Sequence, residues 1–429
     1  MKPPLPRYVG DCYAFRWQDE SVDIELDGVH EARGGELRAV MSVTSTRFGP
    51  KGLLHEGDFN MNGPRARADV VRLLATRVGF DDVDWYGVLE LVCHLAREHW
   101  REGDPLVRLG DHVPEHGDKW LLEPWVEWGG PTVVFAMGGT GKSLFGLAIA
   151  VTIATGQDIG IGLPTKYGRV AYLDWETEID THHERLNALC AAADICPKDV
   201  DIYYRRQSAS LASAATHLRR LLVKENIHYV IVDSLGMARG GEPESADTTI
   251  KLFQAARSLE VPWTGIDHVT KNGGEGQKTP FGSIYTHNSA RRTWGVEKVE
   301  EPGMNAISLL FKNHKANNGR ELPPRAYQLE IRSEDDRMSW AQYRRTEVMQ
   351  TPGFESAGPL NLRIADVLKH SSVALSPEQI AERLDGANVA SVRTVLNRFD
   401  ATFQFVRSER NGRSETRFWG LKSDREEGF

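Results

Sequence analysis

The sequence predicts three parts: a small N-terminal α+β domain, an α/β core built on a parallel sheet, and a C-terminal helix-turn-helix with a wing. Short runs of alternating apolar and polar residues fill the first part. Continuous apolar bursts separated by helical stretches fill the middle, which is typical of parallel strands covered on both faces. Three helical patterns followed by two strand patterns fill the end. We expect the boundaries at 1–115, 116–350 and 351–429.

Composition limits the classes of protein that fit. A length of 429 residues predicts two or three compact units, and 40% hydrophobic with 26% charged residues excludes a disordered or fibrous chain. The net charge of -8 argues against a chain coated in positive charge. We find no apolar stretch of membrane-spanning length and no signal-peptide pattern, so we expect a cytoplasmic protein without a membrane partner. The four cysteines form no CxxC pair, and we interpret them as reduced structural thiols.

The N-terminal part carries sheet signals followed by helix signals. Residues 8–45 alternate around Gly and Asp, which predicts a small antiparallel sheet. Residues 66–78 and 84–103 place apolar side chains at helical spacing, and Asp84 is the expected N-cap of the second helix. We assign no activity to this domain.

The core signals begin near Thr132. Strand-like bursts end in polar residues and are separated by helical stretches, and a turn-rich linker follows at about 350–361. The bursts read TVVFAM, RVAYLDWE, HYVIVDSL, VPWTGIDHV and AISLLFKNH. We therefore expect a parallel sheet with helices on both faces.

A glycine-rich segment, AMGGTGKS, lies between the first burst and an apolar helix. Glycines let successive backbone N–H groups point at a phosphate, and the following helix N-terminus favours negative charge. Lys142 is expected to reach the β- and γ-phosphates and Ser143 to ligate Mg²⁺. The segment predicts ATP and Mg²⁺ as cofactors, held by Gly138, Gly139, Thr140, Gly141, Lys142, Ser143 and Leu144.

Acidic and basic residues end the other bursts. Glu176 follows the second burst and is our candidate for the base that activates water, the alternative being a solvated acid at a helix start. Asp233 closes four apolar residues, the pattern of a carboxylate that holds the Mg²⁺ hydration shell. His268 ends a later burst and is a candidate phosphate sensor or a satisfied strand-end histidine. Lys271 lies in the glycine-rich loop that follows, a candidate DNA contact.

These segments together resemble the RecA-like P-loop ATPases of the RepA-type hexameric replicative helicases. The resemblance covers about residues 120–330 and rests on AMGGTGKS, RVAYLDWETEIDTHHERLNAL, YVIVDSL, DHVTKNGG, GSIYTHNSARRTW and KNHKANNG. It implies a ring of identical subunits with ATP at each interface and single-stranded DNA in the central channel. It also implies that Glu176 is the catalytic carboxylate and His268 the sensor.

The resemblance further implies a basic finger that reaches the neighbouring subunit's ATP. Relatives carry an arginine immediately before the GSIY-like segment, whereas this chain has Pro280-Phe281 there. We rank Lys315 and Arg320 first as the finger because they occupy a strand end and turn. Arg291, Arg292 and Lys312 are alternatives, and each of these basic residues can also solvate a surface.

The tail reverses the sign of the chain's charge. Residues 388–422 hold seven Lys and Arg against three acids, which indicates a phosphate-contacting face. A winged helix can also serve protein contacts alone. For DNA binding we name Arg393, Arg398, Arg410 and Arg413.

The leading hypothesis is an ATP-driven DNA motor, a hexameric helicase that translocates on single-stranded DNA in replication of a phage or mobile element. A RecA-type recombinase or recombination mediator is the first alternative. A DNA-binding regulatory or loader ATPase is the second.

Overall fold

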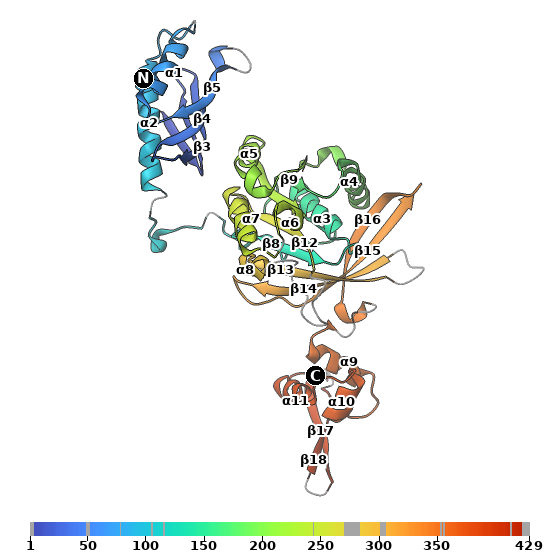
Figure 1. Ribbon diagram of the computed structural model, residues 1–429. Helices are drawn as coiled ribbons and strands as arrows, with labels where there is room; N and C mark the ends of the chain where they lie inside the picture. The colour runs from blue at the N-terminus through green and yellow to red at the C-terminus, as the bar shows by residue number, and fades with distance from the viewer. Residues whose placement is uncertain are drawn as a thin grey trace, which may run out of the picture. The chain divides into compact units, whose positions relative to one another are not determined.

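The computed structural model describes residues 4–48, 52–77, 79–103, 106–114, 116–242, 244–269, 284–300, 306–351, 354, 357–411 and 414–422 (Figure 1). The chain forms two compact units. The first comprises residues 1–117 with 212–224 and 255–260, and the second comprises 118–211, 225–254 and 261–429. The core and the C-terminal module therefore share one unit, and the expected division near residue 350 stays a prediction.

The first unit contains the predicted antiparallel sheet, with its strands in chain order. The strands are β1 (Leu5–Val9), β2 (Cys12–Trp17), β3 (Val22–Glu31), β4 (Leu37–Ser45) and β5 (Leu53–Asn60), and the helices are α1 (Pro64–Ala75) and α2 (Trp85–Glu102). The side chain of Asp84 accepts a hydrogen bond from the Gly87 N–H, which confirms the predicted N-cap. Sequence reasoning missed β5 because glycine and polar residues interrupt its alternation.

The second unit is built on a nine-stranded sheet in the order β10-β9-β11-β12-β8-β13-β14-β15-β16. Its first six strands are parallel, as predicted, and the remaining pairs are antiparallel. The strands are β8 (Thr132–Ala136), β9 (Arg169–Asp174), β10 (Ile202–Arg206), β11 (Ile227–Asp233), β12 (Trp263–His268), β13 (Arg292–Glu300), β14 (Ala306–Ala316), β15 (Arg325–Glu334) and β16 (Arg337–Thr346). A separate small sheet pairs β6 (Trp120–Leu122) with β7 (Val126–Glu127).

The burst AISLLFKNH therefore forms β14, an antiparallel strand, and the expectation of a parallel one is wrong. A parallel neighbour needs a crossover of about a dozen residues, usually a helix. Only residues 301–305 separate β13 from β14, which leaves room for a hairpin connection alone. Sequence reasoning also left β15 and β16 unnamed.

Helices cover the sheet on both faces. The described helices of the second unit are α3 (Lys142–Thr155), α4 (Ile179–Ala193), α6 (Leu235–Ala238), α8 (Ile284–Ser289) and the first part of α7 (Ala246–Ser258). Nearly all of α5 (Leu211–Lys224) and the end of α7 belong to the first unit. Nearly every residue of α3 is buried, because this helix packs between the sheet and α4. Leu235 of α6 meets Gly265 on the other face, so the parallel strands are buried on both sides.

The C-terminal residues follow the predicted order of three helices and two strands. These elements are α9 (Leu360–Lys369), α10 (Pro377–Arg383), α11 (Val389–Arg398), β17 (Phe403–Asn411) and β18 (Ser414–Leu421). They share a small core that includes Ile364, Ile380 and Leu396. The two strands pair antiparallel, so the tail is a three-helix cluster with a hairpin.

Candidate nucleotide-binding site

The glycine-rich segment forms a loop between β8 and α3, in the predicted strand-loop-helix context. Gly139 and Gly141 have φ angles of 71° and 90°, a left-handed backbone conformation that residues with a Cβ atom rarely adopt. Thr140 donates its hydroxyl to the Met137 carbonyl at 2.7 Å, which closes the turn. Leu144 is buried in the first turn of α3 and anchors the loop to the core.

Lys142 lies buried under the loop. Its Nζ donates to the carbonyl oxygens of Ala136 and Met137 at 3.1 and 2.8 Å. Burial lowers the pKa of Lys142, and the nearby carboxylates of Asp233, Glu176 and Asp267 oppose that shift, Asp233 most strongly. The ammonium group is therefore surrounded by the acids that end the neighbouring strands.

Asp233 ends β11 and is 2% exposed. Its Oδ2 accepts a hydrogen bond from the Tyr172 hydroxyl at 2.6 Å. Burial raises the pKa of Asp233, and the hydrogen bonds from Tyr172 and Ser143 work against that rise. A hydroxyl and a carboxylate thus lie together at the start of α3. Hard oxygen ligands of this kind suit Mg²⁺, so Ser143 and Asp233 fit the predicted metal role.

Within the described ranges, no group of three or more His, Cys, Asp or Glu could hold a metal by itself. A Mg²⁺ ion at this position would therefore depend on phosphate oxygens and water to complete its ligands, as Mg²⁺ commonly does.

Glu176 follows β9 and its side chain is 38% exposed. Its Oε1 accepts a hydrogen bond from the Ser234 hydroxyl and lies 3.6 Å from Nε2 of His268. Three strand ends, those of β9, β11 and β12, thus contribute to one polar cluster. Glu176 and His268 lie side by side, and both remain partly open to solvent.

Asp174, two residues before Glu176, is a buried residue of this cluster to which sequence reasoning gave no role. Its Oδ1 accepts the backbone N–H groups of Glu176 and Thr177 at 3.0 and 3.1 Å. Its Oδ2 lies 3.1 Å from His182 Nε2 and accepts the Tyr204 hydroxyl at 3.1 Å.

The electrostatics of Asp174 follow from these partners. Burial raises its pKa, but the hydrogen bonds from His182 and from the Glu176 and Thr177 backbone outweigh burial, so the pKa lies below its usual value. Asp174 therefore stays ionised and fixes the turn that carries Glu176. Two signals could have found it: Asp174 ends an apolar strand pattern, and the run HHxRL begins with its partner His182.

A buried ion pair lies behind His268. Asp267 and Arg239 are both fully buried, and Arg239 Nη2 donates to Asp267 Oδ2 and to the Thr286 hydroxyl, each at 2.8 Å. The His268 N–H donates to the other carboxylate oxygen of Asp267 at 2.9 Å. Burial raises the pKa of Asp267 to about 6, although Arg239 lowers it. The pair connects the residue after α6 with the end of β12 and with α8.

The candidate finger residues differ in their surroundings. Lys315 donates to the carbonyl oxygens of His287 and Asn288 at 2.7 and 2.6 Å, so its ammonium group binds the end of α8. Burial lowers the pKa of Lys315, helped by the nearby charge of Arg291. Arg320 is exposed in the connection between β14 and β15, and no ion pair to it occurs among the described residues.

Of the alternative finger residues, Arg292 is 1% exposed. Its Nε donates to Glu127 at 3.0 Å and its Nη1 to Asn313 at 2.9 Å, so it is a buried structural residue. Lys312 pairs with Glu297 at 3.0 Å. Arg291 is exposed.

The predicted DNA-binding residues are only partly described. Lys271 and Arg413 lie outside the described residues. Arg393 on α11 forms an ion pair with Glu378 of α10. Arg398 is exposed at the end of α11, and Arg410 is exposed on β17 opposite Glu415.

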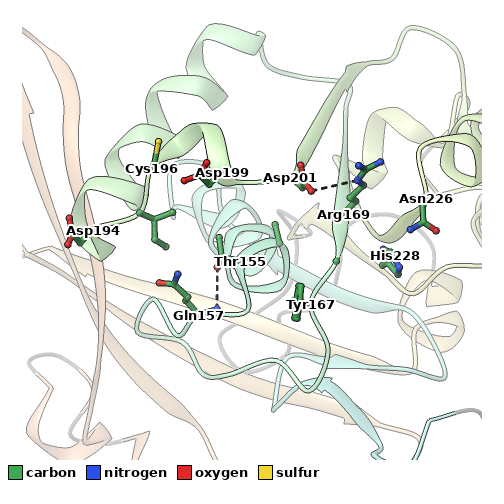
Figure 2. A pocket seen from close by; sticks show the side chains of 13 residues that line it. Thr155, Gln157, Tyr167, Arg169, Asp194, Cys196, Asp199, Asp201, Asn226 and His228 are labelled. Carbon is green, nitrogen blue, oxygen red and sulfur yellow. Dashed lines mark hydrogen bonds and ion pairs between the residues drawn. The ribbon is translucent and has the colours of Figure 1, made fainter.

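A cavity in the second unit lies away from this site. It has a volume of about 610 Å³ and is lined by the starts of β9 and β11 and by the residues after α3 and α4. Figure 2 shows Arg169 and Asp201 paired at its wall, at 3.6 Å. Because parallel strands end at the same edge, this cavity lies at the opposite edge of the sheet from the glycine-rich loop. A second cavity of about 400 Å³ borders the loop at Met137, Gly138 and Thr140.

The glycine-rich loop and the acids at the neighbouring strand ends define a P-loop ATPase core on a parallel sheet. Residues 100–274 match the family model of the AAA domain. No curated protein matches the chain. A KaiC-like protein of the archaeon Pyrococcus horikoshii is similar in structure at 14% identity and a TM-score of 0.39, over 57% of this chain and 100% of that one. No described helix is long and apolar enough to cross a membrane.

Proposed function

We propose that the protein is an ATP-driven motor that translocates on single-stranded DNA, a hexameric helicase for replication of a phage or mobile element. The observation that carries the proposal is the convergence of Lys142, Asp233, Glu176 and His268 at one edge of the parallel sheet. Nucleotide hydrolysis needs a phosphate clamp, a metal ligand and a base in one place, and this edge supplies all three.

In the proposed reaction, Lys142 and the loop N–H groups hold the β- and γ-phosphates. Ser143 and Asp233 would hold Mg²⁺, which when bound would supply charge stabilisation on the phosphate oxygens. Glu176 accepts a proton from the water whose oxygen attacks the γ-phosphorus, and the bond to the bridging oxygen of ADP breaks. His268 contacts the carboxylate of Glu176 and so responds to its protonation.

DNA contact is assigned to the tail and to the loop after β12. Exposed Arg398 and Arg410 support a phosphate-binding face on the tail, which we interpret as a winged helix. Arg393 is paired with Glu378, so we expect it to contribute less to phosphate binding than Arg398 and Arg410. Lys271, in the loop after β12, remains a proposed DNA contact.

A ring of subunits would complete the site. Arg320 is exposed at the strand connection where a finger toward a neighbour would lie, and its guanidinium is free of ion pairs to other described residues. We rank it ahead of Lys315, whose ammonium would first have to leave the carbonyls of α8. The proposal therefore requires a homo-oligomer.

The test is ATP hydrolysis measured with and without single-stranded DNA, duplex DNA and RNA, on protein whose particle mass is followed by mass photometry. Strong stimulation by single-stranded DNA together with ring-sized particles supports the motor. Slow, unstimulated hydrolysis by a monomer or dimer contradicts it and favours a regulatory or loader ATPase. Filaments in electron micrographs instead of closed rings favour a recombinase.

A further inference from the structure

Lys298 is a basic residue that touches the glycine-rich loop from outside the motif. It lies on β13, which runs parallel to β8 and pairs with it as far as Gly295 and Phe135. The strand therefore continues alongside the loop. Lys298 Nζ donates to the Gly139 carbonyl at 2.9 Å and forms an ion pair with Glu300 at 2.7 Å. Its side chain is 27% exposed.

The loop has few other side chains to hold its shape. A Cβ at Gly138 or Gly139 would meet no atom within 4 Å, so this part of the loop is not packed. Side-chain donors to the carbonyls of residues 136–141, within the described part of the chain, are Lys142, Thr140 and Lys298. Lys142 and Thr140 belong to the glycine-rich segment itself, so Lys298 is the donor that ties these carbonyls to another strand, while Tyr172 of β9 donates further along, to the Ser143 carbonyl at 3.4 Å.

The contact has a direct geometric consequence. The carbonyl of Gly139 and the N–H of Thr140 belong to one planar trans peptide group, and they point in opposite directions. By holding the Gly139 oxygen, the Lys298 ammonium therefore also fixes the direction of the Thr140 N–H. A flexible glycine peptide would otherwise be free to turn over.

We propose that Lys298 is a positioning residue for nucleotide binding, which orients the Gly139–Thr140 peptide so that its N–H donates to a phosphate oxygen. The proposal rests on the proposed function only in requiring that the loop binds a nucleoside triphosphate. Charge-assisted hydrogen bonds are stronger than neutral ones, so loss of the ammonium releases the peptide. The contact is formed in ground and transition states alike, so its loss raises KM for ATP and leaves kcat little changed.

The experiment measures the Kd of the full-length protein for AMP-PNP with Mg²⁺ by calorimetry. Lys298→Met is expected to weaken binding about tenfold, equivalent to about 1.4 kcal/mol. Lys298→Arg is expected to restore most of the affinity, because it returns a cationic donor. Lys251→Met is the matched control, because Lys251 is paired with Asp247 on α7, away from the loop. The Kd of this variant for AMP-PNP should stay within about twofold of the wild-type value.

Thermal unfolding without nucleotide separates positioning from general stability. Weaker binding by Lys298→Met at an unchanged melting temperature, with recovery in Lys298→Arg, supports the proposal. Unchanged binding by Lys298→Met, a fall in melting temperature that accompanies weaker binding, or no recovery in Lys298→Arg overturns it. Failure of the wild-type protein to bind AMP-PNP is a different result, because it contradicts the proposed ATPase itself.

Discussion

The two edges of the parallel sheet differ in how their charged residues are held. At the carboxyl edge, Asp174, Asp233 and Asp267 are at most 2% exposed and each accepts hydrogen bonds from side-chain donors. At the amino edge, Arg169 and Asp201 form a 3.6 Å pair with side chains 41% and 59% exposed, beside the larger cavity. We therefore base the proposed site on the convergence of buried, hydrogen-bonded carboxylates and not on cavity volume.

The largest expected effect is on catalysis at the carboxyl edge. Glu176→Gln is expected to keep ATP binding and to slow hydrolysis about 1,000-fold, roughly 4 kcal/mol, because the amide cannot accept the proton of the attacking water. Single-turnover hydrolysis is the measurement. Glu178→Gln is the matched control, since Glu178 is 63% exposed and paired with Arg206. Hydrolysis by Glu176→Gln at the rate of this control would remove Glu176 from the mechanism.

The next largest effect is expected on stability, at the buried ion pair of Arg239 with Asp267. Arg239→Met is expected to lower the free energy of unfolding by about 3 kcal/mol at pH 8, because it leaves the Asp267 carboxylate buried without its partner. The pKa of Asp267 is raised to about 6, above that of an exposed aspartate. The stability linked to its proton is therefore present at low pH and is lost as the pH rises through about 6.

The expected loss in Arg239→Met should consequently be smaller at pH 5 than at pH 8, because a neutral carboxyl needs no cation. Urea unfolding at both pH values measures this. Arg206→Met breaks the exposed pair with Glu178 and should change stability by less than about 0.5 kcal/mol. An equal loss for Arg239→Met at pH 5 and pH 8 would show that the raised pKa has no part in it.

A smaller effect is expected at Asp174. Asp174→Asn removes a charged acceptor that holds the Glu176 and Thr177 backbone, so kcat should fall about tenfold and stability by about 2 kcal/mol. Steady-state kinetics and unfolding of the same sample measure both quantities. Full activity in Asp174→Asn would mean that the turn keeps its shape without this carboxylate.

The smallest effect is expected at the amino edge. Arg169→Met breaks the loose pair with Asp201, and we expect kcat and KM for ATP within about twofold of wild type. The steady-state assay used for Asp174 applies. A tenfold loss of activity would show that ATP hydrolysis depends on the amino edge, beside the larger cavity. The proposed functional difference between the two edges would then be wrong.

The loop, Asp233, Glu176 and His268 could be predicted because short local patterns encode them. A glycine-rich turn before a helix and a carboxylate after an apolar strand are visible within a few residues of sequence. The parallel order of the strands then brings these residues to one edge. The C-terminal order of three helices and two strands could be predicted for the same reason.

Other features depend on contacts between distant residues. Tyr204 reaches Asp174 from the next strand, and Lys298 meets Gly139 from β13, so no local pattern marks either contact. Lys315 resembled a free cation in the sequence, but the α8 carbonyls bind it. The strands β15 and β16 were missed because charged residues interrupt their apolar positions, as at an exposed edge of a sheet.

The most direct test of the account is hydrogen exchange of the backbone amides with and without Mg²⁺ and AMP-PNP. Nucleotide binding at the carboxyl edge predicts slower exchange at residues 138–144, 174–177 and 233–235, and unchanged exchange at 194–201 and 226–228. Protection confined to 194–201 and 226–228 would place the nucleotide at the amino edge and contradict the central claim.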